Sequence, residues 1–319
     1  MSDIGPLPPA PASRGRPRVV LDTDTFNEID DQFALAYLLR AGDRVTTEAV
    51  YAAPYVRGSA KTPRDGMELS YEEIGRLLDL LDMSDTPRSR GAERFLSPRG
   101  TGSTAAREEP EPGPEAAPVS RRDGPGPADS PAARDLALRA LATAPDERLM
   151  IVAIGALTNI ASALLLEPEI ARRATVIWLG GHYPMWPHQN EFNLTGDPVA
   201  AGMVFDSGIP LYVVPCLGVA SVLRTTEPEL RQHLRQTPLS AFLLKRFVAF
   251  GRGADLFSKV IWDIAAIAWL VLPDAVQSFP MATPRVTDSG YVHDPRRHQC
   301  RFAYELDRDA IYRDLFARL

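Results

Sequence analysis

Several short apolar runs alternate with longer stretches of helical spacing, and this alternation limits the fold more than any other feature of the sequence. The runs lie at residues 19–21, 46–55, 148–157, 174–181 and 211–219. Short runs that are apolar at consecutive positions are typical of strands buried on both faces. Such strands, alternating with helices, predict an α/β domain whose mostly parallel sheet is covered by helices on both faces.

The stretches between the runs contain recognisable helix signals. Ser70 and Glu73 form a capping-box pattern, which predicts a helix over residues 71–82. Ser130 followed by Pro131 is typical of a helix N-terminus with proline at its first position. Further helices are predicted over residues 31–40, from about residue 159, and over residues 258–272. The last stretch is apolar almost all round, which is typical of a buried helix.

Two segments have the composition of flexible chain. Residues 1–17 are rich in proline and lack the apolar core of a signal peptide. Residues 97–130 are dense in Pro, Gly, Ser and charge, so burial cannot offset the entropy lost on ordering them. We therefore expect a disordered Pro-rich tail, a single domain over residues 18–319, and a flexible surface insertion within that domain.

Composition excludes several classes of protein. The net charge is −6, from 35 basic and 41 acidic residues, and no basic stripe is present, which argues against nucleic-acid binding. The two cysteines, Cys216 and Cys300, lie far apart and lack metal-ligand spacing, so a disulfide framework is excluded. No apolar run reaches the roughly 18 residues of a membrane span. The sequence predicts a soluble, cytoplasmic protein without a membrane or nucleic-acid partner.

Polar side chains gather where the predicted strands end, which is where open parallel sheets bind their ligands. They are Asp22, Asp24, Asp30 and Asp31 after the first strand, Thr158 and Asn159 after the third, and Glu191, Asn193 and Asp197 after the fourth. Asp263 is the only acid inside the last apolar stretch. Helix capping would explain one or two acids of the first group, but not all four.

A hard cation would explain why so many carboxylates converge. Ca²⁺ prefers six to eight oxygen ligands, and Asp24, Asp31 and Asp263 with a backbone carbonyl at Thr158 would supply several of them. Water beside such an ion becomes a ready nucleophile. Simpler interpretations remain open for two positions: Thr158 can cap a helix, and Asp263 can pair with Lys259 one helical turn earlier.

Four motifs in this order resemble the inosine/uridine-preferring nucleoside hydrolase family. They are LDTDTFNEIDDQFAL, AIGALTNIA, WLGG with NEFNLTGDPVAA, and KVIWDIAAIAWL, and the resemblance runs from about residue 19 to 273 outside the insertion. It implies a single α/β domain with a Rossmann-like open sheet, assembled as a homodimer or homotetramer. It also implies Ca²⁺-dependent cleavage of the N-glycosidic bond of nucleosides, which yields ribose and a free base.

The resemblance also implies a role for each matching residue. The implied metal ligands are Asp24, Asp31, the carbonyl of Thr158, and Asp263, and the implied sugar-binding residues are Asp30, Glu191 and Asn193. Asp24 would also be the general base, and Asp22 would support the ligands from behind. Anionic groups around the sugar fit a transition state that resembles an oxocarbenium ion.

The sequence differs from the family pattern at residues expected near the leaving base and the ribose. Trp262 stands before Asp263 where many members have a histidine, and an indole can stack on a base but not protonate it. His182 and His188, on the loop before the EFN motif, are candidates for that proton donor or are ordinary loop histidines. Pro54 stands where the family commonly has an asparagine near the ribose, and it cannot supply that amide.

The acidic loop is also longer than usual. Five residues, 25–29, separate Asp24 from Asp30, where the family pattern has three that include Pro-Gly. Asn27 and Glu28 within this loop either reach the substrate or cap the helix and face solvent. The His-Asp-Pro string at residues 293–295 resembles a family motif, but its polar context makes Asp263 the better match.

Two other functions fit parts of the pattern. A haloacid-dehalogenase-type phosphatase also begins with an apolar strand and Asp-x-Asp, although Phe26 stands where that pattern wants Thr or Val. A non-catalytic nucleoside or sugar binder that kept its metal site would explain the missing histidine and asparagine. The survival of Asp24 favours the hydrolase.

Overall fold

The computed structural model describes residues 15–97, 126–144, 146–252, 256–287 and 290–319. Most of the predicted Pro-rich tail and most of the predicted insertion therefore lie outside the described residues. Where residues 15–17 and 126–130 are described, no helix or strand begins.

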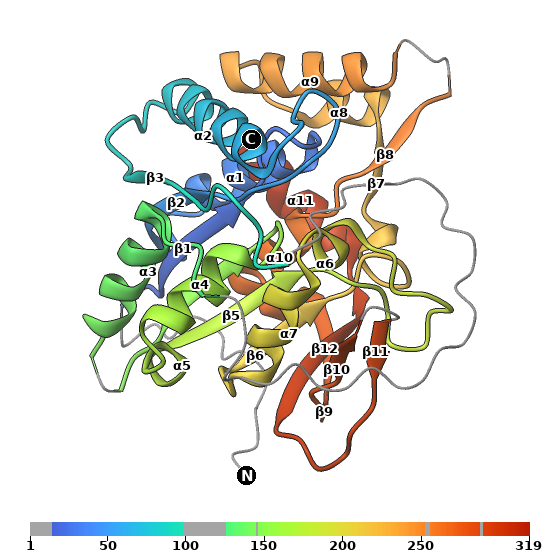
Figure 1. The fold of residues 1–319 in the computed structure, drawn as a ribbon. Coiled ribbons are helices and arrows are strands. Elements are labelled where there is room, and N and C mark those ends of the chain that lie inside the picture. Colours follow the sequence, from blue (N-terminus) through green and yellow to red (C-terminus); the bar gives the residue numbers. More distant parts are fainter. Residues whose placement is uncertain (1–14, 98–125, 145, 253–255, 288–289) are drawn as a thin grey trace.

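An eight-stranded sheet forms the centre of the described chain, in the order β3-β2-β1-β4-β5-β6-β12-β9 (Figure 1). Its strands are β1 Arg18–Thr23, β2 Thr46–Ala52, β3 Arg88–Arg90, β4 Leu149–Ala153, β5 Ala174–Leu179, β6 Leu211–Val214, β9 Val276–Ala282 and β12 Gln299–Leu306. All neighbours are parallel except β12 and β9, which are antiparallel. The predicted mostly parallel sheet is confirmed.

Two separate two-stranded sheets and a set of helices accompany the central sheet. The small sheets pair β7 Arg224–Thr226 with β8 Ser258–Val260, and β10 Arg285–Thr287 with β11 Gly290–Val292. The helices are α1 Asp30–Arg40, α2 Pro63–Leu80, α3 Pro131–Leu141, α4 Thr158–Leu166, α5 Ile170–Arg173, α6 Phe192–Gly196, α7 Pro198–Asp206, α8 Glu227–His233, α9 Pro238–Phe250, α10 Ile264–Val271 and α11 Arg308–Arg318. None of these described helices has the length and apolar character needed to cross a lipid bilayer.

Helices cover both faces of the sheet, as the sequence predicts. Alternate residues of β1 face opposite sides, because side chains along a strand alternate. Val19 and Leu21 pack into a core with α1, α2, α9, α10 and α11, whereas Val20 packs into a second core with α3, α4 and α7. The carboxyl ends of the parallel strands meet at one edge between these layers, and this edge positions the site.

The second helix begins earlier than the sequence predicts. Helix α2 starts at Pro63, and Thr62 and Asp65 form a reciprocal capping box at its N-terminus. Ser70 and Glu73, the predicted capping box, lie inside this helix and are buried. A proline at the first helical position tolerates the missing N–H, so Thr62 with Pro63 is the stronger start signal.

The long apolar stretch 258–272 divides into two elements. Residues Ser258–Val260 form β8, which pairs with β7, and the helix α10 begins only after Asp263. Every residue of α10 is buried, so the predicted buried helix is confirmed over this shorter range. Lys259 lies on the strand, and the predicted helical pairing of Lys259 with Asp263 is therefore wrong.

Candidate metal and substrate site

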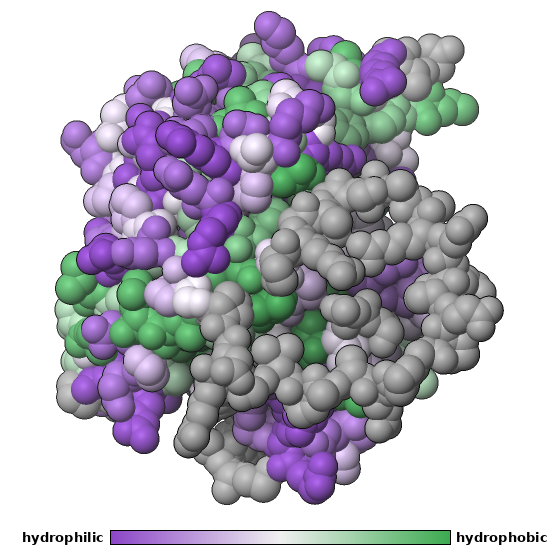
Figure 2. Space-filling model, viewed as in Figure 1, coloured by the Kyte–Doolittle hydropathy of each residue, from purple (hydrophilic) through white to green (hydrophobic). Residues whose placement is uncertain are grey.

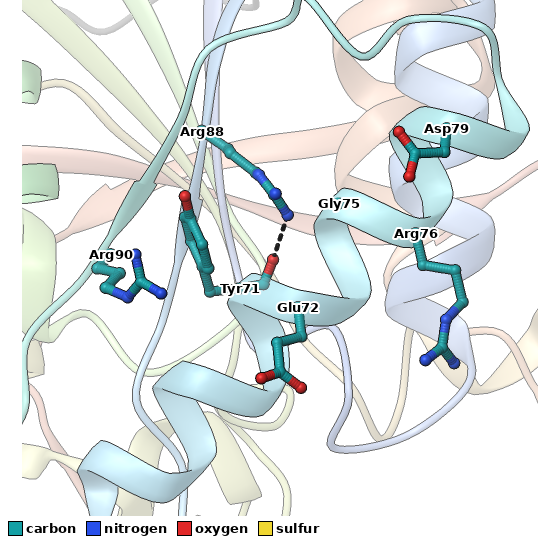
Figure 3. A pocket seen from close by; sticks show the side chains of 7 residues that line it. All are labelled: Tyr71, Glu72, Gly75, Arg76, Asp79, Arg88 and Arg90. Atoms are coloured by element: carbon teal, nitrogen blue, oxygen red, sulfur yellow. Dashed lines mark hydrogen bonds between the residues drawn. The ribbon is translucent and has the colours of Figure 1, made fainter.

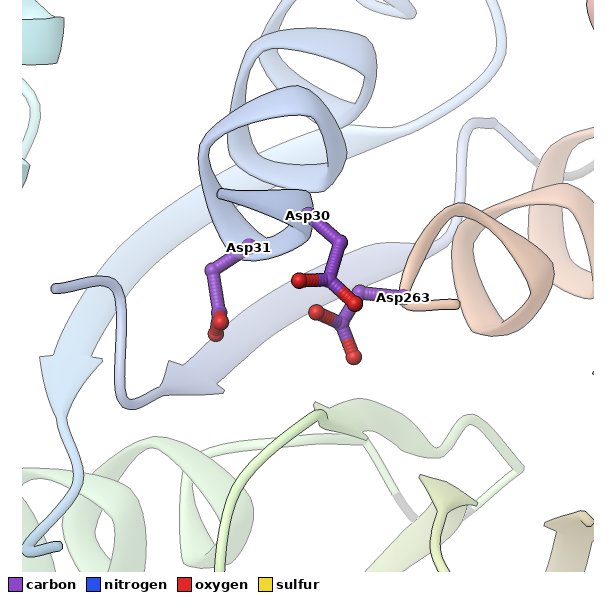
Figure 4. Close-up of side chains that lie close together, drawn as sticks. All are labelled: Asp30, Asp31 and Asp263. Carbon is purple, nitrogen blue, oxygen red and sulfur yellow. The ribbon is translucent and has the colours of Figure 1, made fainter. Parts of the chain in front are cut away.

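Four buried aspartates from distant parts of the chain meet beyond the carboxyl end of β1, and we call them the acid cluster: Asp24, Asp30, Asp31 and Asp263. Asp30 and Asp31 open α1, and Asp263 directly precedes α10 (Figure 4). One carboxylate oxygen from each of these three residues lies within 4.8 Å of the other two. The tertiary fold therefore brings together acids that are more than 230 positions apart in sequence.

Backbone contacts hold the loops that carry the acid cluster. The N–H of Asn27 donates to the Asp24 carbonyl at 2.7 Å and closes a tight turn directly after β1. The Trp262 N–H donates to Asp30 Oδ2 at 3.3 Å, which links the start of α1 to the start of α10. Asp24 is only 1% exposed, so the turn directs its carboxylate inward.

Electrostatics in the acid cluster disfavour the ionised carboxylates. Burial, with the neighbouring charge of Asp30, raises the pKa of Asp31 to about 7. Burial and the charge of Asp31 raise the pKa of Asp24 well above its ordinary value. Burial, followed by the charges of Asp31, Asp30 and Asp24, does the same for Asp263. Without a counter-charge these groups cannot all be ionised at neutral pH.

The described residues supply few donors to these carboxylates. The Thr23 hydroxyl donates to Asp31 Oδ1 at 2.6 Å, and the Asn27 amide donates to Asp24 Oδ2 at 2.9 Å. Asp263 has no hydrogen-bond donor within the part of the chain that the structure describes. Buried carboxylates without donors or counter-charges are costly, and a hard cation is the partner their oxygen chemistry fits.

One cation, Lys259, reaches the edge of the acid cluster. Its Nζ lies 3.3 Å from Asp30 Oδ1 and 2.6 Å from Glu28 Oε2. Burial acts to raise the pKa of Glu28, but the charges of Lys259 and Arg57 outweigh it and lower that pKa. Lys259 thus pairs directly with Asp30 and Glu28, and its charge opposes the rise in the pKa of Asp263 only in part.

The other two predicted ligands, Asp24 and Thr158, lie after β1 and after β4. Asp24 lies beside Asp31 and against Gly155, where a Cβ would come within 3.1 Å of Asp24 Oδ1. Thr158 opens α4, and its hydroxyl donates to Asp197 Oδ2 at 2.8 Å. Thr158 is the first residue of α4, and its carbonyl stays a predicted metal ligand.

Asp22, for which the family resemblance implies a supporting role, lies on β1 two residues before Asp24. Asn159 donates to Asp22 Oδ2 at 2.7 Å, and the Asn159 Oδ1 accepts from the Ala92 N–H at 2.8 Å. Asp22 Oδ1 is buried and has no partner among the described residues. Burial raises the pKa of Asp22 to about 7, and the Asn159 bond opposes this only in part.

Glu191 and Asn193 have a clear structural role at the end of β5. Glu191 accepts the N–H groups of Gly181, Asn193 and Leu194 at 2.8–2.9 Å and caps α6. The Asn193 amide donates to the carbonyls of Ile154 and Leu179, which joins the ends of β4 and β5. Both side chains are more than nine-tenths buried. Their predicted contact with a sugar stays a prediction.

His182 is buried and electrically neutral at pH 7. Burial and the neighbouring His188 lower the pKa of His182 to about 4. The Leu217 N–H points to His182 Nδ1 at 3.3 Å, so the remaining proton of the neutral ring belongs on Nε2. His188 is exposed, with its ring centroid 5.3 Å from that of His182. His182 can donate a hydrogen bond, but it is not an imidazolium acid at neutral pH.

Trp262 and Tyr55 line the same region. Trp262 is partly buried, and Lys259 Nζ lies 6.0 Å from its ring centroid. Tyr55, which follows the predicted Pro54 departure, is 3% exposed, and burial followed by the charges of Asp24 and Asp31 raises its pKa. Neither Tyr55 nor the Lys259–Glu28 pair is predictable from local pattern, because both depend on loops meeting in space.

A shallow surface depression of about 370 Å³ lies elsewhere, between α2 and β3 (Figure 3). Its lining is charged, and the Arg88 and Arg90 guanidinium carbons lie 4.4 and 3.9 Å from the Tyr71 ring centroid. Hydrophilic side chains gather over α2 on this face of the molecule (Figure 2). These are solvated ion pairs and ring contacts on an exposed helix, and they offer no set of reactive groups.

Comparison with known proteins agrees with this geometry. A family model described as inosine-uridine preferring nucleoside hydrolase matches residues 19–313. The chain belongs to this family. The predicted resemblance to nucleoside hydrolases is thereby confirmed, and the phosphatase alternative is wrong, because the family match extends over both the acidic loop and α10.

Individual nucleoside hydrolases match parts of the chain. Over 194 residues it is 31% identical to the pyrimidine-specific ribonucleoside hydrolase RihA of Klebsiella pneumoniae, a match that covers 54% of this chain and 61% of that protein. Over 146 residues it is 38% identical to the non-specific ribonucleoside hydrolase RihC of Shigella flexneri, covering 44% and 46%. The chain thus spans about half to three fifths of the length of these curated relatives.

Solved nucleoside hydrolase structures share the fold over almost the whole chain. A plant nucleoside hydrolase, PpNRh1, superposes with a TM-score of 0.71 at 22% identity, covering 95% of this chain and 99% of that one. The purine-preferring ribonucleoside hydrolase from Gardnerella vaginalis gives 0.66 at 20% identity, covering 94% and 97%. At these identities the likeness establishes the α/β fold of the family.

Proposed function

We propose that this protein hydrolyses the N-glycosidic bond of ribonucleosides, with Ca²⁺ as its cofactor, to give ribose and a free base. The main support is the set of buried carboxylates that converge without enough donors or positive charge to balance them. Family membership supplies the reaction class. The substrate is a nucleoside or another N-riboside, and the sequence pattern leaves the preferred base open.

Asp24, Asp31 and Asp263 would hold the metal ion. Their oxygens match the hard-donor preference of Ca²⁺, and backbone carbonyls or water would complete its six to eight ligands. The carbonyl of Thr158, at the start of α4, would be a further ligand. When bound, the ion would supply positive charge that keeps these acids ionised and makes a nearby water molecule more acidic.

The carboxylates of Asp24 and Asp30 would have further, separate roles in the reaction. Asp24, at the end of β1, would accept the proton of the attacking water. Asp30, held by the Trp262 N–H and by Lys259, would orient the sugar hydroxyls. The surrounding negative charge favours a sugar that becomes positively charged as the glycosidic bond breaks. Glu191 and Asn193 would face the sugar from the opposite loop.

The leaving base would receive little acid help from His182. A histidine whose pKa is about 4 is unprotonated at neutral pH and can only donate a hydrogen bond from Nε2. Trp262 would stack on the base instead. This arrangement favours bases that leave readily, so a substrate with a poor leaving group would be cleaved slowly.

The test measures reducing sugar released from a panel of ribonucleosides, with Ca²⁺ and with a chelator. We expect Ca²⁺-dependent release from at least one nucleoside, and a loss of about 10³-fold in kcat for Asp24→Ala. Turnover that survives in Asp24→Ala would contradict the role of Asp24 as base.

The non-catalytic binder remains the second candidate, because Trp262 stands where many family members have a histidine and the pKa of His182 is lowered to about 4. Metal-dependent binding of ribose or a nucleoside without any cleavage would establish it. We also propose a cytoplasmic homodimer or homotetramer, which sedimentation of the purified protein would test.

A further inference from the structure

Contacts of the residues on both sides of Asn27 hold the lengthened loop 25–29 in place. On one side, the Phe26 ring centroid lies 5.1 Å from the guanidinium carbon of Arg246 in α9. On the other side, Glu28 pairs with Lys259 of β8 and with Arg57 of the loop after β2. These contacts tie the loop to three separate elements, so Asn27 between them is held in a defined place beside the acid cluster.

The Asn27 side chain is only half satisfied. Its Nδ2 donates to Asp24 Oδ2 at 2.9 Å, and its backbone N–H donates to the Asp24 carbonyl at 2.7 Å. Its Oδ1 is buried and has no hydrogen-bond partner within the described chain. A buried acceptor normally has a hydrogen-bond donor, so Asn27 Oδ1 can still accept a bond from one more O–H or N–H group.

The orientation of the amide follows from its neighbour. A rotated Asn27 would place Oδ1 against the Asp24 carboxylate, two acceptors facing each other, so the amide nitrogen belongs on Asp24. Oδ1 therefore points to a position next to the catalytic carboxylate but away from it. Asp24 is itself the acceptor for the proton of the attacking water, which leaves Oδ1 for the next donor in the site.

We propose that Asn27 Oδ1 accepts a hydrogen bond from one hydroxyl of the bound sugar, and that the lengthened loop contributes this residue to substrate recognition. The inference rests on the proposed function, since it requires a sugar beside Asp24. Pro54, in the adjacent loop after β2, has a side chain that can neither accept nor donate, so this position supplies no acceptor to the sugar.

The test compares the wild type and Asn27→Ala on the best ribonucleoside and on its 2′-, 3′- and 5′-deoxy analogues. For the wild type, kcat/KM should fall by about tenfold or more when the contacted hydroxyl is removed from the substrate. In Asn27→Ala the same removal should cost about threefold or less, because the partner is already absent. The other two deoxy analogues should lose equal factors in both proteins.

Several controls make the outcome decisive. Gln236→Ala removes an exposed amide between α8 and α9 and should keep the wild-type discrimination among all four substrates. Asn27→Ser serves if Asn27→Ala fails to fold. Equal hydroxyl discrimination in the wild type and the Asn27 variant overturns the inference, even if overall activity falls.

Failure of the proposed function is recognisable separately. If the wild type cleaves no nucleoside, calorimetry with Ca²⁺ and with ribose, 2-deoxyribose, 3-deoxyribose or 5-deoxyribose replaces the kinetic measurement. The hydroxyl preference in binding should then weaken in Asn27→Ala by the same factor, and an unchanged preference overturns the inference.

Discussion

Two groups of buried acids lie at the same edge of the sheet, and burial raises the pKa of both. The acid cluster after β1 consists of carboxylates that face one another. Glu191 and Asp197, after β5, instead face backbone N–H groups, and we call them the backbone-bonded acids. Asp197 accepts from the N–H groups of Leu96, Ser97 and Ala200 and from the Thr158 hydroxyl.

The neighbours of a buried acid decide what it can do. In the acid cluster, adjacent carboxylates raise the pKa further after burial has raised it. In the backbone-bonded acids, N–H groups oppose the effect of burial. A satisfied carboxylate stabilises loops in the protein alone, whereas an unsatisfied cluster gains its stabilisation only when an ion binds.

Removing one charge from the acid cluster should have the largest effect. Asp31→Asn keeps the Thr23 contact and the side-chain volume but loses a metal ligand, so Ca²⁺-dependent kcat/KM should fall by about 10³-fold. The free energy of unfolding of the metal-free protein should rise by about 1 kcal/mol, because a repulsive buried charge is gone. Steady-state kinetics and urea unfolding in chelator measure the two effects. A variant that is less stable without metal would contradict the distinction between the two groups.

Removing a backbone-bonded acid should lower the free energy of unfolding and leave Ca²⁺ affinity almost unchanged. Asp197→Ala leaves Leu96, Ser97, Ala200 and Thr158 without their acceptor and removes the N-cap of α7, so the free energy of unfolding should fall by about 3 kcal/mol. Ca²⁺ affinity of the folded fraction should change by less than about threefold. Urea unfolding and calcium titration test this, and a large loss of Ca²⁺ affinity would show that the two groups act as one.

The free energy of unfolding should also depend on pH, and the direction of this dependence should reverse when metal is bound. Asp31 and Asp22, each with a pKa of about 7 in the folded chain and 3.8 ordinarily, bind protons that the unfolded chain releases. The free energy of unfolding of the metal-free protein should therefore fall as pH rises from about 4 to about 7. His182 has the opposite effect on the free energy of unfolding below about pH 6.5, because its pKa is lowered in the folded chain. One histidine offsets only part of the effect of two acids.

Added Ca²⁺ should stabilise the protein more as pH rises through the same range, since the ion requires ionised ligands. Thermal unfolding with Ca²⁺ and with chelator at several pH values measures both trends. Stabilisation by Ca²⁺ that is independent of pH would indicate that the ion binds away from Asp31.

Much of the fold was predictable from local pattern. The strand-and-helix alternation predicts the parallel sheet, and Ser130 with Pro131 predicts the start of α3. Local pattern failed where tertiary pairing competes with propensity. Residues 258–260 look like the first turn of an apolar helix, but pairing with β7 makes them a strand. The start of α2 was missed because its first eight residues, PRDGMELS, are mostly polar and show little apolar periodicity.

The sequence by itself determined that acids follow β1 and that an isolated acid precedes an apolar helix, because residue type and local spacing are written in the chain. Only the tertiary structure decided which of these acids share one space, since packing α10 beside α1 brings Asp263 to Asp30 and Asp31. It also decided which acids are satisfied: Glu191 and Asp197 each accept from several backbone N–H groups, whereas Asp30 accepts from one, that of Trp262, and the other acids of the cluster face one another. Residues 25–29 show the same division, because their length is visible in the sequence but the unpaired Oδ1 of Asn27 depends on contacts with β8, α9 and the loop after β2.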